Sequence, residues 1–358
     1  MTTRRGGSIL FLTPAFLADR RHKRVHGVEI FNSLFIRRLL ELGHPVTLPI
    51  EPRWSTPLRE HLPEHPALEV VPGLPLRRPL PVSLALVPSL RRRGPFDLLI
   101  LGNNGRGILP AARLLRAGSG AKRTVLFAHQ FPRPDYLRAI ARMGIPVHAV
   151  SHAVGDAFKA GGVREVNVSY GVLSAERFHP RAGDRPPGPL RFGVVGQLDT
   201  PWKGAHLALD AWRMLPDRLR GRVELHLLAY RHPPPDPPPG AVPHEWLPPG
   251  GVADFLRTLD ALIVPSTSAE TFSQVTVQAM LTGLPILAYD LPVLAEKLDA
   301  GGGAVFRSAA ELAALVERLH DDEPARAAMG DAARATALQR YVWRAEEFVE
   351  RYLSPVTG

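Results

Sequence analysis

A glutamate just ahead of a helix start has the residue type and spacing for work on a bound anion. Glu270 lies between an apolar run that ends near Pro265 and a helical pattern over 274–283. The first turn of a helix offers free N–H groups and the positive end of the helix dipole. A diphosphate could therefore be bound by the backbone amides of Phe272, Ser273, Gln274 and Val275, with Glu270 facing the group it carries. The spacing is equally compatible with Glu270 only complementing the helix dipole.

Two further polar side chains could extend this site. Gln278 lies about a turn and a half into the same helix, where its amide could bond hydroxyl groups. Lys203 lies in a loop after the apolar run Phe192–Val195, and lysine is a compact cation that suits phosphate oxygens. The alternatives are an ordinary helix residue and a solvated loop lysine.

Two residues of the N-terminal half are of types that could contact a phosphate or a sugar. Gly27 opens a helical pattern over 28–42, and a glycine there lets the backbone come close to a phosphate. His129 lies at the end of the apolar run LFA (126–128), although a lone histidine is more often structural.

Short apolar runs alternate with helical patterns along the chain. Most runs are continuously apolar, which is typical of parallel strands covered on both faces. The first seven predicted strands are Ser8–Leu12, Val46–Pro49, Leu68–Val71, Asp97–Leu101, Val125–Ala128, Val147–Ser151 and Val166–Ser169. The last five are Phe192–Val195, Val223–Ala229, Ala261–Pro265, Ile286–Tyr289 and Ala304–Phe306. Further helices are predicted over 204–214, 252–258, 274–283 and 309–320.

A segment rich in proline, glycine and charge divides the two series of strands. Residues 174–190 (SAERFHPRAGDRPPGPL) therefore predict an interdomain linker. The two β/α halves predict two Rossmann-like doubly wound domains, over residues 1–175 and 190–340. Ligands of such sheets bind beyond the carboxyl ends of the strands, so we expect the site in a cleft between two facing domains.

Composition excludes several classes of protein. The 358 residues contain no cysteine, which rules out disulfide scaffolds, Cys-ligated zinc, iron–sulfur clusters and thiol catalysis. The longest apolar stretches, such as Leu80–Leu90, are well short of the ~20 residues that a membrane helix needs. Arg4-Arg5 and Ile9–Leu12 only faintly resemble a signal peptide, because the run ends at Pro14. We expect a cytoplasmic protein.

The charge is uneven. Residues 1–180 contain 26 Lys or Arg and 12 Asp or Glu, against 18 and 22 in residues 181–358. The basic runs Arg20–Arg24, Arg77-Arg78 and Arg91–Arg93 could attract an anionic membrane surface, with Leu80–Leu90 in the headgroup layer. Such runs are more often solvated faces. No nucleic-acid-binding motif is visible, so no nucleic-acid partner is expected.

The stretch from Glu270 to Pro285 resembles the signature of the retaining glycosyltransferases of the GT-B fold, specifically the large family four. That signature is E-G/T-F-G-x-x-x-x-E-A-M followed by G-x-P-V, and this chain has ETFS at 270–273, QAM at 278–280 and GLP at 283–285. The resemblance implies that Glu270 bonds the donor sugar, that Thr271 and the amides after it contact the donor, and that position 278 contacts the ribose. Gln278 replaces the second glutamate and brings no charge. Ser273 replaces a common glycine.

Four weaker matches occur, and along the chain they fall in the family's order. FGVVGQLDTPWKG (192–204) resembles the loop whose Lys-Gly holds the donor pyrophosphate, which implies donor contacts for Gly196, Gln197 and Lys203. Gln197 stands where an arginine is usual. HGVE (26–29) resembles a G-G-x-E loop at Gly27, and His129 resembles a histidine that faces the sugar. YVWRAEEFVERYL (341–353) resembles a terminal helix that returns, within 341–358, to the first domain.

The resemblance implies an enzyme, a retaining glycosyltransferase of the hexosyltransferase type. It would move a sugar from a nucleotide-diphosphate donor to a glycan, lipid-linked or small-molecule acceptor in cell-surface glycan or glycolipid biosynthesis, with Glu270, Lys203 and His129 as catalytic residues. No Asp-x-Asp occurs, so we expect neither a metal nor another cofactor. Two alternatives remain: a non-catalytic GT-B relative that binds a glycan or partners an active enzyme, and a basic membrane or nucleic-acid binder.

Overall fold

The chain forms two compact units. Unit 1 is Met1–Leu173 with Trp343–Gly358, and unit 2 is Ser174–Val342. The computed structural model describes residues 6–13, 27–50, 62, 64–72, 86–103, 108–171, 175–183, 185, 187–230, 232–247 and 250–353. Several sequence features lie outside these described residues: Arg4-Arg5, Arg20–Arg24, His26, Arg77-Arg78 and 80–85.

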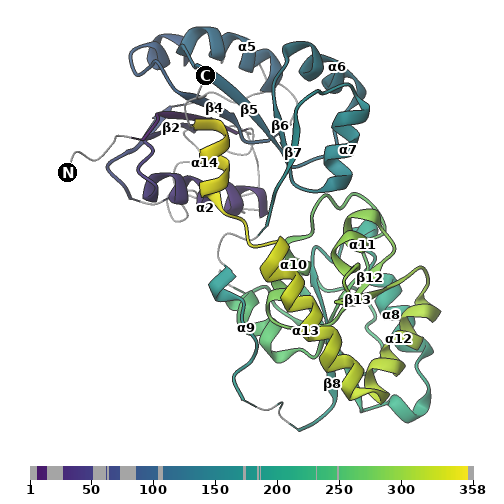
Figure 1. Ribbon diagram of the computed structural model, residues 1–358. Coiled ribbons are helices and arrows are strands. Elements are labelled where there is room, and N and C mark those ends of the chain that lie inside the picture. The colour runs from purple at the N-terminus through teal and green to yellow at the C-terminus, as the bar shows by residue number, and fades with distance from the viewer. Residues whose placement is uncertain are drawn as a thin grey trace. The chain divides into compact units, whose positions relative to one another are not determined.

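Unit 1 contains a parallel sheet with the strand order β3-β2-β1-β4-β5-β6-β7 (Figure 1). Its strands are β1 (Ile9–Leu12), β2 (Val46–Ile50), β3 (Leu68–Pro72), β4 (Leu98–Leu101), β5 (Arg123–Ala128), β6 (Val147–Ala149) and β7 (Val166–Val168). All residues of β1, β2 and β4 are buried, as their continuous apolar sequences predict.

The unit 1 helices are α2 (Gly27–Glu41), α5 (Ile108–Ser119), α6 (Pro134–Met143), α7 (His152–Ala160) and α14 (Ala345–Leu353). The last of them comes from the far end of the chain and packs beside α2, where Figure 1 shows it in yellow. Phe348 of α14 meets Phe35 of α2 edge-on, with ring centroids 5.1 Å apart. The Tyr352 hydroxyl of the same helix accepts a hydrogen bond from the Asn167 side chain at 3.1 Å. The terminal helix is thus part of the unit 1 core.

Unit 2 contains a second parallel sheet, with the order β10-β9-β8-β11-β12-β13. Its strands are β8 (Leu190–Gly196), β9 (Val223–Ala229), β10 (Ala241–His244), β11 (Ala261–Val264), β12 (Ile286–Tyr289) and β13 (Gly303–Phe306). The first strand of the unit, β8, and β11 are central neighbours, so the loops that leave their carboxyl ends meet at one edge of the sheet.

The unit 2 helices are α8 (Ala205–Met214), α9 (Gly251–Thr258), α10 (Gln274–Leu281), α11 (Pro292–Leu298), α12 (Ala309–Asp321) and α13 (Glu323–Arg340), with short 3₁₀ turns η2 (Ala175–Arg177), η3 (Pro201–Lys203) and η4 (Asp217–Leu219). Side-chain caps set two of the starts. Ser308 accepts from the Glu311 N–H at 3.2 Å ahead of α12, and Asp322 accepts from the Ala325 N–H at 2.9 Å ahead of α13.

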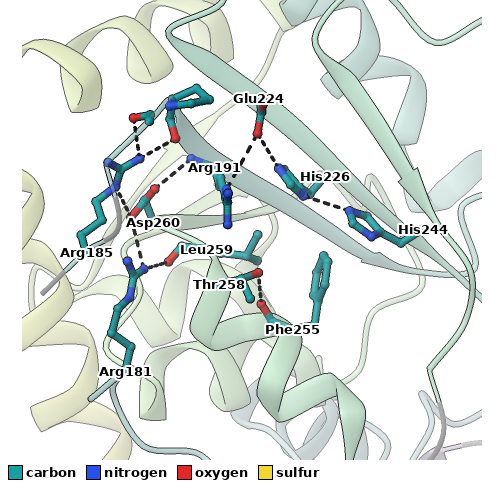
Figure 2. Close-up of polar contacts among 12 residues, drawn as sticks. Arg181, Arg185, Arg191, Glu224, His226, His244, Phe255, Thr258, Leu259 and Asp260 are labelled. Carbon is teal, nitrogen blue, oxygen red and sulfur yellow. Dashed lines mark hydrogen bonds and ion pairs between the residues drawn. The ribbon is translucent and has the colours of Figure 1, made fainter. Parts of the chain in front are cut away.

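One carboxylate, that of Asp260, joins the segment before β8 to the start of β11. Arg185 donates to Asp260 Oδ1 at 2.9 Å and Arg181 approaches the same oxygen at 3.2 Å (Figure 2). The backbone N–H of Arg191 donates to Asp260 Oδ2 at 2.9 Å. Asp260 directly precedes β11, so these contacts fix the start of that strand.

Each strand predicted from an apolar run is present, with ends shifted by at most two residues. The helix predicted over 341–353 is wrong at its start, because α14 begins at Ala345. Tyr341 instead belongs to the end of α13, where its N–H donates to the Ala337 carbonyl at 2.9 Å. Across the described part of the chain, no helix combines the length and the apolar character needed to cross a membrane.

Candidate functional site

The loop after β11 places a buried carboxylate at the edge of the unit 2 sheet. Ser266 is 3% exposed and donates its hydroxyl to Glu270 Oε1 at 3.0 Å. Glu270 itself is 8% exposed, although it lies in a loop. A buried carboxylate needs a cation or several donors to remain ionised. The structure supplies a cation from the neighbouring loop.

That cation is Lys203, whose Nζ forms an ion pair with Glu270 Oε1. The pairing joins residues 67 positions apart in the sequence, and it brings together two of the predicted catalytic residues. The Lys203 side chain remains 24% exposed, and its Nζ also lies 4.5 Å from the centre of the Trp202 ring. Lys203 is therefore able to exchange its protein partner for a ligand without leaving the site.

Close contact between two loops delivers Lys203 to this position. Gly204, directly after η3, has a positive φ of 68°, and a Cβ added there would lie 2.0 Å from the Pro265 carbonyl oxygen. Only glycine fits such an approach. The Thr267 N–H also donates to the Trp202 carbonyl at 2.8 Å. These contacts hold the loop after β8 against the loop after β11.

The backbone on both sides of the glutamate is in an unfavourable conformation. Ala269 has φ 58° and Ser273 has φ 64°, in the left-handed region that L-residues avoid. Glycine takes this conformation without a steric penalty, which explains why glycine would be the ordinary choice at position 273. Such strain persists where the surrounding structure fixes a functional geometry, at a cost of about 1–3 kcal/mol per residue.

The first turn of the helix that follows is only partly exposed. Ser273 is the N-cap residue of α10, and its hydroxyl pairs with the Thr276 hydroxyl at 2.7 Å rather than with a backbone N–H. Gln274 and Gln278 are half-buried, as is Thr271, whereas Thr276 is buried. The start of α10 has the partial positive charge that the sequence predicts for anion binding, and Gln274 there is partly accessible.

Gly196 and Gln197 lie at the end of β8, next to this loop pair. Gly196 has φ 142°, and its carbonyl accepts from the Tyr230 N–H at 2.8 Å. Gln197 is half-exposed, and its carbonyl accepts from the Thr200 N–H at 3.1 Å. The amide side chain of Gln197 adds no charge, so Lys203 is the cation that this loop contributes to the edge of the sheet.

Sequence reasoning missed Lys297 on α11. Its side chain is 0% exposed, and its Nζ lies 4.6 Å from the centre of the Phe272 ring. Burial lowers the pKa of Lys297, while the charges of Glu296 and Glu270 act in the opposite direction. The available signal was the rarity of lysine, since the chain has only five.

In unit 1, Gly27 is the first residue of α2 and His129 follows β5. The His129 ring is 4% exposed, stacks on Phe127 at 4.9 Å and meets Tyr170 edge-on at 5.6 Å. Burial first, and then the charge of His148, lowers the pKa of His129 to about 3. His129 is therefore neutral at physiological pH. Its contact with a sugar stays a prediction.

Part of the predicted membrane-facing stretch lies inside unit 1. Leu86 is 3% exposed and Leu90 is 0% exposed, so these two side chains belong to the protein core. The adjoining residues 91–93 are exposed arginines, and Arg93 donates to Glu69 at 2.6 Å. In the described ranges, no cluster of three or more His, Asp or Glu side chains could hold a metal ion.

Comparison with known proteins identifies the segment that carries this site. Residues 189–322 match the model of a family described as Glycosyl transferases group 1. The match includes both Lys203 and Glu270. Residues 189–322 are therefore similar to the group 1 glycosyltransferases, and the resemblance predicted from the motifs is confirmed. No curated protein sequence matches the chain.

Solved structures extend the likeness to almost the whole chain. Alr3699/HepE from Anabaena, in complex with UDP-glucose, is 19% identical with a TM-score of 0.73, over 97% of this chain and 98% of that one. A glycosyltransferase from Rickettsia africae ESF-5 is 13% identical with a TM-score of 0.78, over 98% of each chain. WaaG, a glycosyltransferase involved in lipopolysaccharide biosynthesis, is 15% identical with a TM-score of 0.69, over 97% of this chain and 100% of that one. At such low identity the likeness concerns the fold, and it confirms the GT-B fold.

Proposed function

We propose that this protein is a retaining glycosyltransferase that transfers a sugar from a nucleoside diphosphate donor to an acceptor hydroxyl. The observation that carries the proposal is the Lys203–Glu270 ion pair, which lies at the carboxyl edge of a parallel sheet within the group 1 segment. Solved relatives of the same fold include one in complex with UDP-glucose.

Lys203 is the group proposed to bind the donor diphosphate. In the unliganded arrangement its ammonium is paired with Glu270 and partly exposed. A diphosphate at the start of α10 would attract that ammonium, and the helix-start amides would add donors to the phosphate oxygens. Negative charge grows on the diphosphate as it departs, so these donors stabilise the transition state more than the ground state.

Glu270 is the group proposed to hold the transferred sugar. When Lys203 turns toward the diphosphate, the carboxylate becomes available to accept hydrogen bonds from sugar hydroxyls, while Ser266 keeps it in place. The bond from the anomeric carbon to the diphosphate oxygen breaks, and a bond to the acceptor oxygen forms on the same face. The acceptor proton passes to the departing phosphate oxygen, so no separate general base is required. Gln278 would bond the ribose, and neutral His129 would offer an uncharged hydrogen bond to the sugar.

The remaining parts of the proposal concern partners and surroundings. We propose that the reaction needs no metal, that the acceptor is a glycan, a lipid-linked sugar or a small molecule, and that the product enters cell-surface glycan or glycolipid synthesis. The excess of basic residues in positions 1–180 supports an anionic acceptor or a peripheral position on the cytoplasmic side of a membrane. One of the relatives of like fold acts in lipopolysaccharide biosynthesis.

Two substitutions favour a second candidate function. Gln197 and Gln278 are neutral where the family pattern has charged residues, which weakens a donor site. A non-catalytic relative that binds a glycan or a nucleotide sugar would tolerate both changes. It would bind a donor without hydrolysing it.

Calorimetry with a panel of UDP-, GDP- and ADP-sugars tests the proposal. The enzyme is expected to bind at least one of them and to hydrolyse it slowly without an acceptor, and EDTA is expected to leave that hydrolysis unchanged. Binding without any hydrolysis indicates the non-catalytic relative. Binding to none of the donors contradicts the proposal.

A further inference from the structure

Lys297 is a buried cation behind the candidate site. It lies on α11, whose sequence is PVLAEKL, and its side chain is fully buried. The ammonium donates to the Val293 carbonyl at 2.7 Å and lies 3.3 Å from Glu296 Oε1. Removing an ammonium from water costs several kcal/mol unless it is compensated. A methionine or leucine would fill the same space without that cost, so a role for the charge must be sought.

Two aromatic rings also lie close to this ammonium. The centre of the Phe272 ring lies 4.6 Å from Nζ and the centre of the Tyr341 ring lies 5.3 Å from it. The two rings meet edge-on, with centroids 6.0 Å apart. A cation over an aromatic face is attracted to it, and the attraction is stronger away from water. Lys297 therefore fixes the orientation of Phe272.

Phe272 is the inner anchor of the loop that carries Glu270. Its ring is 4% exposed, and its backbone lies between Glu270 and the strained N-cap residue Ser273. The same loop is held from the other side by Ser266 and Lys203, which both contact the Glu270 carboxylate. The charge of Lys297 also interacts favourably with that of Glu270.

We propose that Lys297 is a positioning residue of the donor site, which acts through Phe272 to set the Glu270–Ser273 loop. This inference rests on the proposed function. Once Lys203 turns to the diphosphate, Glu270 loses its cation, and the loop that carries it depends on Ser266 and on Phe272 for its position.

Lys297→Met tests the inference, because it keeps the length of the side chain and removes the charge. The expected result is a fall in kcat of roughly tenfold, because the loop that carries Glu270 loses the contact that sets its position. The melting temperature is expected to stay the same or rise, because an expensive buried charge is gone. Lys159→Met, at a lysine with 53% side-chain exposure, is the matched control and should change none of these values.

A double-mutant cycle with Phe272→Leu tests the route of the effect. If Lys297 acts through Phe272, the double variant loses no more kcat than the worse single variant. Losses that multiply would overturn the route, and a Lys297→Met protein with wild-type kcat would overturn the inference while leaving the proposed function intact. A loss of kcat that only follows a lowered melting temperature would assign Lys297 a purely structural role. A wild-type protein that turns over no nucleotide sugar contradicts the proposed function itself.

Discussion

Two buried carboxylates lie at opposite ends of strand β11 and are held in different ways. Asp260, just before the strand, is bonded by the guanidinium groups of Arg181 and Arg185 and by the backbone N–H of Arg191. Glu270, in the loop beyond the other end, is bonded by one hydroxyl and one ammonium. Both side chains are less than a tenth exposed.

We interpret this difference as one between a structural carboxylate, Asp260, and the carboxylate proposed to be functional, Glu270. Planar guanidinium groups and a backbone N–H bind both oxygens of Asp260, so its partners have no reason to exchange. A lysine is a flexible point charge, and the one at Glu270 is partly exposed and lies beside a helix start that can attract an anion. The backbone near Glu270 is also strained at Ala269 and Ser273, in a loop that the packing fixes. The partners of Asp260 are therefore fixed, whereas we expect Lys203 to exchange Glu270 for a bound anion.

The strongest test of this contrast removes the functional pair. Glu270→Ala and Lys203→Ala are each expected to lower the transfer rate by about 10³-fold or more, because each removes a group that meets developing charge or the sugar. Glu270→Ala should unfold at nearly the wild-type urea concentration, since the partly exposed Lys203 can turn toward water, whereas Lys203→Ala should unfold at a lower urea concentration because it leaves the buried Glu270 carboxylate without its cation. Steady-state kinetics with the donor found by calorimetry, together with urea unfolding, measure both effects. Full activity in either variant would contradict the assignment.

The converse test removes the structural carboxylate. Asp260→Ala is expected to lower the free energy of unfolding by about 3 kcal/mol, because two arginines and a buried N–H lose their common acceptor. The kcat of the folded fraction should stay within a factor of about two of the wild-type value, since the structure gives Asp260 no part in the donor loop.

Asp321→Ala provides the control for that measurement. Asp321 pairs with Arg218 at 2.8 Å on the surface, where both side chains are 48% exposed. An exposed ion pair contributes little, so this variant should unfold like the wild-type protein. A stable Asp260→Ala protein that has lost its turnover would abolish the proposed distinction between the two ends of β11.

The sequence was sufficient to predict the strands that are buried on both faces of a sheet. Continuous apolar runs predicted every strand of that kind, and the Glu270–Pro285 motif predicted which edge carries the site. It was insufficient for β10, an edge strand of sequence AVPH that follows a proline-rich stretch and is only partly buried. Proline argues against a central strand because it cannot donate a hydrogen bond to the neighbouring strand. It is tolerated at a sheet edge, which is where β10 lies.

Helix α13 and Lys297 escaped prediction for other reasons. Residues 323–340 are rich in alanine and arginine and have a narrow apolar stripe, in which Gly330, Ala333 and Ala337 are buried. Small residues bury a helix face without the large side chains that reveal periodicity. A lysine is expected to be exposed, so the sequence does not predict the burial of Lys297. Its contacts with Phe272 and Tyr341 join residues that are distant in the sequence.

The pH dependence of stability and of turnover gives a further test of the Glu270 end of β11, because the buried Lys297 contacts Phe272 in the loop of Glu270. Burial lowers the pKa of Lys297 below its ordinary value of 10.5. The folded protein therefore releases this proton at a lower pH than the unfolded chain, and the contribution of Lys297 to stability rises with pH between the two pKa values. Turnover should move the opposite way, because the neutral amine no longer attracts the Phe272 ring.

The measurement compares wild type with Lys297→Met across the alkaline range, so that other titrating groups cancel. The charged or titratable groups that face the amine are Glu296 on its own helix, Glu270 across the loop and Tyr341 at the end of α13, whose pKa burial raises. Wild-type turnover is expected to fall through this window while Lys297→Met stays flat. Parallel profiles for the two proteins would show that the Lys297 charge does not reach the site.

The smallest expected effect concerns the strained backbone beside Glu270. Ala269 is exposed and has φ 58°, so its methyl group meets the steric penalty of about 1–2 kcal/mol for an L-residue in this region. Ala269→Gly removes that penalty. It also raises the conformational entropy of the unfolded chain, which lowers the free energy of unfolding by roughly 0.5–1 kcal/mol. The net result should be a gain of about 0.5 kcal/mol in the free energy of unfolding, measured by urea titration. Turnover should fall by a few fold, since a glycine lets the loop leave the conformation that presents Glu270. A gain in stability with unchanged kcat would show that this strain is incidental, and Phe272 and its neighbours alone would then fix the loop.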